Sequence, residues 1–561
     1  MHRWRHVYKY ALTALGLLVA PLALPAQILP GPADAGRVRP EALPQTPGMP
    51  QPVEVAPTAI PAQAVPMEAK KVRFILRKVH FRKMTAFSEA ELAPIYAPYM
   101  GKEITLDQVW YMAGQLTERY RAAGYFLSRA FVPQQHIRNG EITLEAVEGY
   151  IGIVEGAVEL QEYSVIREAI AEIYTERPVT LPTLEGLLLR LNAIPGFSFR
   201  AVLTEWKDGE RGAVKLVLTP SEKRNQGSVS FDNSGSRFLG PHLVTLAYRA
   251  NLLPMQETSI SLSASLPADE LQYAYLEHRI ALTSRLSLVL DGSISHAEPG
   301  YTLEQFDIKS RAYSLGVGFD YALVKERAQT LDLGLYLDGR NAVSEQLNNT
   351  LSDDRVRALR WHADYGGSDS WNGNNQARFI LSQGLDILGG SEADEPNLSR
   401  AEAKPDFRKA ELTLARAQGI TQNWSLFGSV YGQYASGPLY SSEEAGYGGR
   451  LYGRGYDSSE ITGDHGLMGV VEVRYGGFGQ LEPVGLLPYA FYDAGKVWNE
   501  DLGSPSSAAG SSAGIGVRLF SPYQLSGELG LAVPLTRPAE SPIYGNNGKQ
   551  PRLLFQISHS F

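Results

Sequence analysis

Polar and apolar positions alternate along most of the chain beyond residue 227, and helical periodicity disappears there. The final segment shows the alternation clearly. One face of it carries Leu553, Phe555, Ile557, His559 and Phe561, and the other carries Leu554, Gln556, Ser558 and Ser560. Because successive side chains of a strand point to opposite faces, a period of two predicts strands with one apolar and one polar face.

Sixteen such segments follow one another between residues 223 and 561. They begin near Ser228, Leu243, Ser259, Leu271, Leu286, Ala312, Leu331, Val356, Ala377, Phe407, Trp424, Met468, Pro488, Ala513, Leu525 and Arg552. About 21 residues are then available for each strand with its connection, which suits transmembrane strands of roughly ten residues. The pattern predicts a membrane β-barrel of 16 antiparallel strands over residues 223–561.

A soluble all-β protein also shows alternation, so other signals decide between the two classes. The segments have no repeat periodicity, and aromatic residues such as Tyr301, Tyr431 and Tyr475 stand near strand ends. The start of the chain has the features of a secretory signal peptide over residues 1–26: basic Arg3 and Arg5 precede an apolar run over residues 11–24. That run is short for a helix, which needs about twenty residues to span a bilayer. Any membrane-embedded part is therefore expected to be built from strands.

Between the signal peptide and the barrel, the pattern predicts a proline-rich linker over residues 27–69 and two small α+β units over residues 70–149 and 150–222. Each unit has the order β-α-α-β-β. In the first unit, Val109, Met112, Leu116 and Tyr120 recur at helical spacing, and Gly124 ends that helix. The second unit has helices expected over residues 163–174 and 183–193, followed by strands over residues 197–205 and 212–218.

Two motifs in the barrel resemble those of a known family. Arg454-Gly455-Tyr456 lies in a glycine-rich loop over residues 446–466, and Phe491, Asp493 and Gly495 form a Phe-x-Asp-x-Gly stretch in the thirteenth strand. Together they resemble the two-partner secretion transporters, the TpsB family of ShlB/FhaC/HecB-like haemolysin secretion/activation proteins. The α+β units resemble POTRA domains through Gly124-Tyr125, Val147-Glu148-Gly149 and the stretch over residues 191–196.

The resemblance implies an outer-membrane transporter of a Gram-negative cell, with the POTRA domains in the periplasm. Such a transporter moves a large unfolded exoprotein to the cell surface and recognises it by its N-terminal secretion domain. The loop over residues 446–466 folds into the lumen, where Arg454 pairs with the carboxylate of Asp493 and the small Gly495 leaves room for the loop. Members of the family often thread a plug helix through the barrel. Prolines limit such a helix here to a short one near residues 33–39.

Two further expectations concern the barrel wall and the end of the chain. The alternation over residues 468–475 places Glu472 and Arg474 together on the lumen side, where charge is tolerated. The terminal aromatic residue Phe561 resembles the signal by which the barrel assembly machinery recognises its substrates. Partners expected besides the exoprotein are therefore this machinery and outer-membrane lipid.

Composition excludes several other classes of function. The chain has no cysteine, a formal net charge of −8 and no basic block, which argues against disulfides, thiolate metal sites and nucleic-acid binding. The ten histidines show no metal-ligand spacing, and no nucleophile elbow or phosphate loop is found, so no metal, cofactor or catalytic residue is expected. Two alternatives to a secretion transporter stay open. One is an assembly factor for other barrel proteins, although such factors typically have three to five POTRA domains. The other is a diffusion porin, in which no Arg-Gly-Tyr loop held against the barrel wall is expected.

Overall fold

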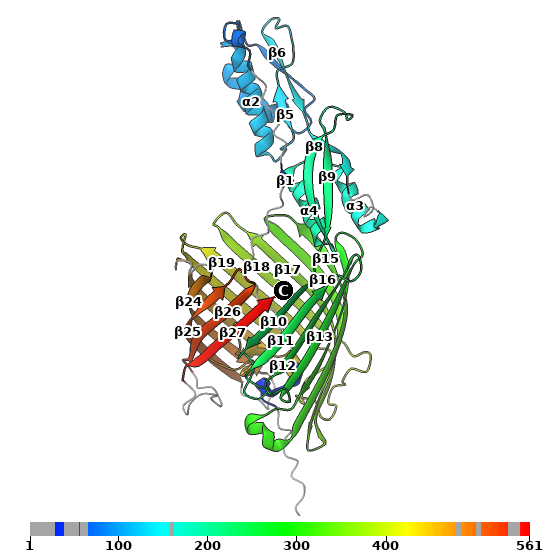
Figure 1. Cartoon of the computed structure of the whole chain (residues 1–561), viewed down its shortest axis with the longest axis vertical. Helices are drawn as coiled ribbons and strands as arrows, with labels where there is room; N and C mark the ends of the chain where they lie inside the picture. Colours follow the sequence, from blue (N-terminus) through cyan, green and yellow to red (C-terminus); the bar gives the residue numbers. More distant parts are fainter. Residues whose placement is uncertain are drawn as a thin grey trace, which may run out of the picture.

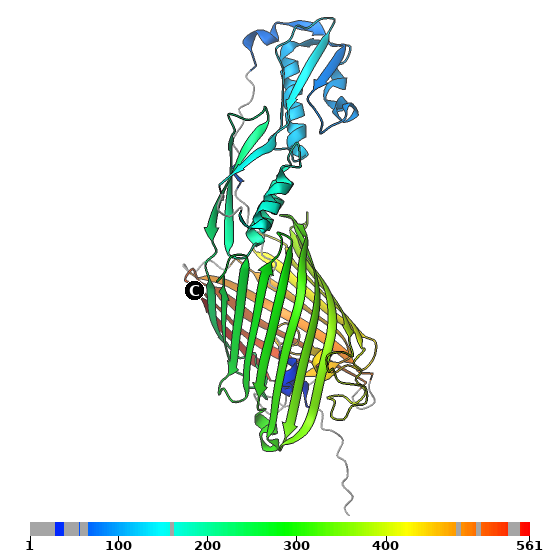
Figure 2. The ribbon, with the colours of Figure 1, turned by 90° about the vertical axis from the view of Figure 1, so that its right-hand side faces the viewer.

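The structure is a computed structural model that describes residues 29–38, 65–156, 162–477, 484–500, 506–536 and 550–561, together with the backbone of residues 55–56. A closed barrel of sixteen strands forms one end of the molecule, and two α+β units extend from its rim (Figures 1 and 2). The prediction of a 16-stranded barrel preceded by small α+β units is confirmed. The predicted signal peptide lies outside the described residues.

Each barrel strand pairs antiparallel with its neighbours, and the last strand pairs with the first. The strands are β10 (Gln226–Asp232), β11 (Leu243–Ala250), β12 (Gln256–Ser265), β13 (Leu271–Ala281), β14 (Leu286–Ala297), β15 (Ile308–Lys325), β16 (Gln329–Gln346), β17 (Asn349–Ser368), β18 (Gly373–Gly384), β19 (Arg408–Gly419), β20 (Trp424–Ala435), β23 (His465–Tyr475), β24 (Gly485–Trp498), β25 (Ser507–Phe520), β26 (Leu525–Pro534) and β27 (Arg552–Ser560).

The period-two pattern explains which side chains face outward. Leu553 and Ile557 of β27 are exposed on the outer wall, as are alternate residues of β15: Tyr313, Leu315, Val317, Phe319, Tyr321 and Leu323. The residues between them face the lumen. Three neighbouring strands, β15 to β17, reach 18 to 20 residues and are longer than the roughly ten residues expected.

The closure of the barrel uses the terminal residue. The backbone amide of Phe561 donates to the carbonyl of Gly227 at 2.8 Å, and the amide of Gly227 donates to the carbonyl of Phe561 at 2.8 Å. The Phe561 ring packs over Gly227, where a Cβ would lie 2.3 Å from it, so a larger residue at position 227 would make the ring shift.

The first α+β unit contains β3 (Lys78–Arg82), α1 (Glu89–Tyr96), α2 (Leu106–Ala122), β5 (Arg129–Phe131) and β6 (Glu141–Val147). Its sheet has the order β3-β6-β5. The apolar face of α2 packs on this sheet with Val109, Met112, Leu116 and Tyr120 fully buried, as their spacing predicts. A short two-stranded sheet, β2 (Arg73–Ile75) with β4 (Glu103–Thr105), lies beside it. Residues 72–81, whose pattern indicates one strand, are thus divided between β2 and β3 in two different sheets.

The second unit repeats the order with β7 (Tyr150–Glu155), α3 (Ser164–Ile173), α4 (Leu181–Ala193), β8 (Phe197–Glu205) and β9 (Ala213–Glu222). Its apolar core takes in Met255, from the turn between β11 and β12, and Ala281, the last residue of β13, both at the barrel end that faces the α+β units. Lys223 caps the end of α4 by donating to the carbonyls of Asn192 at 2.7 Å and Ile194 at 2.9 Å, and burial lowers the pKa of its amine. The second unit is therefore seated on the barrel rim.

The segment before the α+β units is in contact with both the barrel and the second unit. Residues 31–37 form two 3₁₀ turns, η1 (Gly31–Ala33) and η2 (Ala35–Arg37), inside the barrel at the end away from the α+β units (Figures 1 and 2). Further along, β1 (Val55–Ala56) pairs in parallel with the edge strand β8 of the second unit. The short plug helix expected near residues 33–39 is thus a pair of 3₁₀ turns over its described part: Asp34 between them has an extended backbone, and Gly36 disfavours an α-helix. Among the described residues, no helix has the length and hydropathy needed to cross a bilayer.

Candidate functional site

The connection between β20 and β23, residues 436–464, folds into the barrel and is called loop 6 below. It contains η7 (Ser441–Glu443) and a small hairpin of β21 (Ala445–Tyr447) and β22 (Ile461–Gly463). Its apolar side chains pack against the inner wall, where Tyr447 and Tyr456 form a buried cluster with Met468 and Val497. Arg454, at the tip of this loop, is 4% exposed.

The guanidinium of Arg454 is held by the wall of β23 and β24. Its Nη2 donates to Glu472 Oε2 at 2.9 Å, and its Cζ lies 4.1 Å from the centre of the Phe491 ring. Stacking on an aromatic face suits the planar guanidinium, which is weakly hydrated. The Arg454 guanidinium is thus fixed by one charged hydrogen bond and by cation–π contacts with Phe491 and, at 5.7 Å, with Tyr489.

Glu472 is the centre of a larger charged cluster. Its Oε1 accepts from Arg474 Nε at 2.6 Å and from Arg518 Nη1 at 2.5 Å, so three guanidinium groups share one fully buried carboxylate. Glu528 adds a second negative charge 3.5 Å from Arg518. Glu472 and Arg474 lie on the lumen side of β23, and the structure brings both to the tip of loop 6.

Asp493 holds the loop in another way. Its carboxylate accepts from Tyr447 Oη at 2.9 Å, from Ser512 Oγ at 2.6 Å and from the backbone amide of Arg454 at 3.3 Å. The expected ion pair between the Arg454 side chain and Asp493 is therefore wrong in its partner: the guanidinium binds Glu472, and Asp493 binds the backbone of Arg454. Glu472 lies directly across from Phe491 in the β23–β24 register, which brings its carboxylate within reach of the guanidinium.

Two glycines make room for the loop. A Cβ on Gly495 would lie 2.3 Å from the ring of Tyr447, and one on Gly455 would lie 2.9 Å from the Cβ of Ser512. Both approaches are too close for a real side chain. The glycines of the two motifs therefore set how deeply loop 6 enters the barrel.

The outer part of loop 6 is anchored by further ion pairs. Its carboxylates are at Glu443, Glu444, Asp457, Glu460 and Asp464, and all five are buried or nearly so. Their partners come from different parts of the barrel and are Arg237 with Asp457 and Glu460, Arg360 and Lys409 with Glu443, Arg400 with Glu444 and Asp464, and Arg552 with Asp457. Removing one partner of a buried pair typically costs about 3–5 kcal/mol, so these contacts hold the loop firmly while all are present.

The N-terminal segment adds another set of contacts to loop 6. Arg37 donates through Nη1 to the carbonyl of Ser441 and through Nη2 to the carbonyl of Glu444 at 3.0 Å. Ser441 Oγ donates to Asp34 Oδ2 at 2.6 Å. On the wall side, Arg340 donates to the carbonyl of Gly36 at 2.7 Å. Residues 31–37 are thus wedged between loop 6 and the barrel wall.

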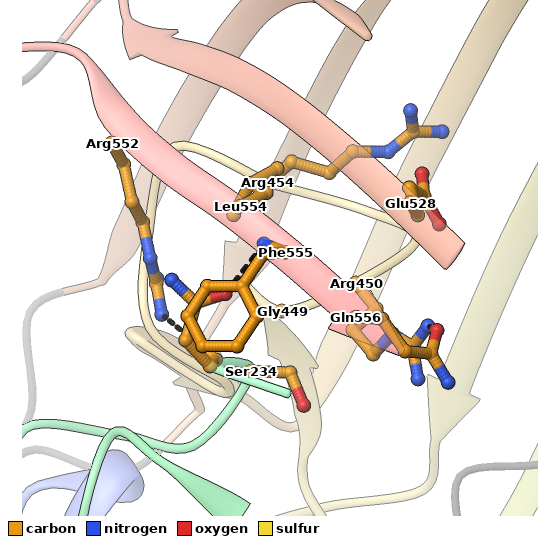
Figure 3. Close-up of a pocket in the computed structure, with 10 residues that line it drawn as sticks. Ser234, Gly449, Arg450, Arg454, Glu528, Arg552, Leu554, Phe555 and Gln556 are labelled. Carbon is orange, nitrogen blue, oxygen red and sulfur yellow. Dashed lines mark hydrogen bonds between the residues drawn. The ribbon is translucent and has the colours of Figure 1, made fainter. Parts of the chain in front are cut away.

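Loop 6 also reaches the last two strands. Figure 3 shows Arg450 beside Gln556 of β27, to which it donates through Nη2, and Arg454 extending on the side of Glu528 of β26. The small cavity between these side chains measures about 40 Å³, so the tip of the loop is closely packed against the wall. Within the described residues, no group of three or more His, Asp or Glu side chains is arranged to hold a metal ion.

Comparison with known proteins places the chain in a family. The model of the haemolysin secretion/activation protein ShlB/FhaC/HecB matches residues 212–517, more than half of the chain, and the model of the ShlB-type POTRA domain matches residues 74–149. The chain belongs to the haemolysin secretion/activation protein family. This membership confirms the resemblance seen in the Arg-Gly-Tyr and Phe-x-Asp-x-Gly motifs.

Relatives of this haemolysin secretion/activation protein include two transporters. This chain is 24% identical over 404 residues to the heme/hemopexin transporter protein HuxB of Haemophilus influenzae, and the alignment covers 69% of each chain. It is also 24% identical over 486 residues to the outer membrane transporter CdiB of Dickeya dadantii, covering 83% of this chain and 84% of that one.

Among solved structures, the fold is similar to CdiB from Escherichia coli, with a TM-score of 0.68 at 17% identity over 90% of this chain and 93% of that one. CdiB from Acinetobacter baumannii gives a TM-score of 0.60 at 13% identity over 92% and 94%. At these identities the likeness concerns the fold.

As a member of the family, the protein is an outer-membrane transporter of the two-partner secretion type, and its POTRA domains lie in the periplasm. The predicted function and location are thereby confirmed. Because the POTRA side is periplasmic, loop 6 and residues 31–37 lie toward the extracellular end of the barrel (Figure 2).

Several residues in the site of this secretion transporter belong to no recognisable sequence motif, so they were not singled out from the sequence. Arg518 and Ser512 follow the Phe-x-Asp-x-Gly stretch on the next strand, β25, and the alternation of β25 could have placed both in the lumen. Tyr447 and Arg37 could not have been found in that way, because they come from a loop and from a proline-rich segment without periodicity.

Proposed function

We propose that this protein exports one large exoprotein, which crosses the barrel unfolded, from the periplasm to the cell surface. The observation that carries the proposal is a closed barrel whose lumen is filled by a loop held through polar contacts. Such contacts are strong while all partners are present, but each can be exchanged for water or for another polar group. A lumen closed in this way suits a pore that opens for one cargo and closes again.

Capture is proposed to occur on the POTRA domains, here assigned to residues 70–149 and 150–222. An extended secretion domain would add a strand to a sheet edge, a binding mode that uses backbone hydrogen bonds. Nothing in this mechanism calls for a chemical reaction, so no enzymatic role is proposed. Folding of the cargo outside the cell would supply the driving force.

The two motifs are proposed to act as a reversible latch. Arg454, Gly455 and Tyr456 form its moving part, and Phe491, Asp493 and Gly495 form the seat on β24. The charged lumen residues Glu472 and Arg474 complete the latch. The barrel, assigned to residues 223–561, is proposed to be inserted into outer-membrane lipid by the barrel assembly machinery through the strand that ends at Phe561.

The test of function compares culture supernatants and surface proteins of cells with and without this chain. Loss of one large exoprotein, with other outer-membrane barrels at normal levels, is the expected result. A joint fall of many barrels would instead identify an assembly factor. Unchanged profiles, together with stable small-solute conductance in planar bilayers, would identify a porin.

The test of the latch uses Arg454→Ala and Asp493→Ala. Each removes contacts between loop 6 and the wall, so export is expected to fall while the barrel remains in the membrane. The measurement is the amount of secreted exoprotein relative to barrel content of the outer membrane. Normal export by both variants would show that the latch has no part in transport.

A further inference from the structure

One side of the lumen is lined by small, uncharged side chains. It is formed by β27, β10, β11 and β12, which are neighbours in the barrel. The inward-facing residues that alternate with outward-facing positions such as Val229, Leu246 and Ile260 include Ser228, Ser230, Thr245, Ala247, Ser259, Ser261, Ser263, Ser558 and Ser560. These nine residues are called the hydroxyl wall below. On β27, Gln556 faces the same way and is covered by Arg450 of loop 6.

The hydroxyl wall is bounded by charges. On the same strands, charged lumen residues occur toward the strand ends, with Arg249 and Glu257 on the periplasmic side and Asp232 on the other. On one flank lies the cluster around Glu472. On the other flank, Arg279 of β13 pairs with Asp320 of β15 at 2.6 Å. The middle of the hydroxyl wall is therefore an uncharged strip between two charged ones.

Open space lies directly against this strip. A cavity of about 480 Å³ is lined by Ser230, Thr245, Ser261 and Ser263 on the wall side. Across from them it is lined by Gly31, Pro32, Asp34 and Arg37 of the N-terminal segment and by Gly449, Ser458 and Ser459 of loop 6. Four residues of the hydroxyl wall thus face open space, with Asp232 at the outer edge of the cavity, and the N-terminal segment and loop 6, including Arg450, lie across from them.

We propose that the hydroxyl wall is the surface along which the exported polypeptide slides. A conducting path must bind its cargo well enough to admit it and weakly enough to release it. Serine and threonine hydroxyls donate and accept hydrogen bonds, so they match an extended backbone at any register. Charged side chains would instead retain cargo segments of opposite charge, because the attraction is strong in a partly dry lumen.

This assignment rests on the proposed export function and adds the route to it. Residues 31–37 and the part of loop 6 near Ser458 and Ser459 must then move, which breaks the ion pairs of Asp457 and Glu460 with Arg237. Glu472, Arg474 and Arg518 lie on the flank of the route, so the barrel-wall part of the charged cluster does not contact the cargo along its length.

Site-directed cross-linking tests the route, and the absence of cysteine in the chain makes single-cysteine variants clean. Thr245→Cys on β11 is compared with Thr413→Cys on β19, eight strands away in the ring of sixteen, where exposed Leu412 and Leu414 show that Thr413 faces inward. Each cysteine carries a benzophenone maleimide. The probe is the exoprotein identified from the supernatant comparison, fused to a disulfide-locked domain that stalls it in the full-length transporter.

The expected result is several-fold more adduct at Thr245→Cys, and likewise at Ser261→Cys, than at Thr413→Cys. Equal or greater adduct at Thr413→Cys, with export intact, overturns the route and leaves the export function standing. If wild-type cells export no protein that depends on this chain, the proposed export function is wrong, and the proposed route is wrong with it.

Bulky substitutions provide a second measurement. Thr245→Trp and Ser261→Trp place a large ring on the route, so export is expected to drop several-fold, whereas Thr413→Trp is expected to leave it near the wild-type level. Heat-modifiable migration on gels checks that each barrel is folded. Folded barrels with normal export from both route variants would overturn the assignment.

Discussion

At the residue scale, Glu472 links the positive charges at the tip of loop 6. Three guanidinium groups, from Arg454, Arg474 and Arg518, converge on this buried carboxylate. The alternation of the twelfth strand predicted that Glu472 and Arg474 face the lumen. The convergence itself could not be predicted, because it depends on the register between β23, β24 and β25.

Glu472→Gln is expected to lower the free energy of unfolding of the barrel by about 3–5 kcal/mol, since three guanidinium groups would then share a neutral amide. Urea unfolding in detergent, followed by tryptophan fluorescence, measures the change. The exposed Glu304 provides the control, and Glu304→Gln is expected to stay within about 0.5 kcal/mol of the wild type. Equal stability of the two variants would show that the arginine cluster does not depend on Glu472.

At the element scale, the fit between β24 and β21 decides where loop 6 rests. Gly495 faces the ring of Tyr447, and the hydroxyl of the same tyrosine donates to Asp493. Sequence alternation placed Asp493 and Gly495 on one face of the strand. It could not show that a tyrosine from another hairpin fills the space above them.

Gly495→Ala is expected to push Tyr447 away from the wall and loosen loop 6, because the new Cβ would lie 2.3 Å from the ring. Such overpacking typically costs about 1–3 kcal/mol. Single-channel recordings should show more frequent or larger openings than in the wild type. Gly428→Ala on β20 is the matched control, since its nearest neighbour would be 3.8 Å away. Identical recordings for both variants would contradict this account of the loop.

The elements themselves were well predicted in kind and order. All sixteen barrel strands and both β-α-α-β-β units follow from periodicity and turn residues. The extra length of β15 to β17 was missed, because polar residues at their outer ends carry no lipid-facing pattern yet pair across the hairpin. A proline-rich linker was expected over residues 27–69, with room for a short plug helix near residues 33–39, and the described part of that stretch forms 3₁₀ turns instead.

At the scale of the whole molecule, the second POTRA domain and the barrel share one apolar core. Met255, in a turn between two barrel strands, is 7% exposed and packs into that core, whereas Leu252 in the same turn is 74% exposed. The transporter can therefore pass a movement of this domain directly to the barrel rim.

Met255→Asp is expected to detach the second POTRA domain from the rim. The variant loses a buried methionine, typically about 2–5 kcal/mol, and must also bury a charge or expose the core. Limited proteolysis near residues 223–226 should become several times faster in the purified protein. Leu252→Asp is the control and should be cut at the wild-type rate. Unchanged cleavage of Met255→Asp would mean that this contact does not hold the domain.

The sequence by itself determined the class of the molecule, since period-two alternation, turn residues and helix spacing act locally along the chain. It also marked the two motifs of the latch. Only the tertiary structure decided that Arg454 binds Glu472 while Asp493 binds the backbone, that residues 31–37 brace loop 6, and that a hydroxyl wall faces the open part of the lumen. These features depend on strand register and on contacts between residues hundreds of positions apart, which no local pattern encodes.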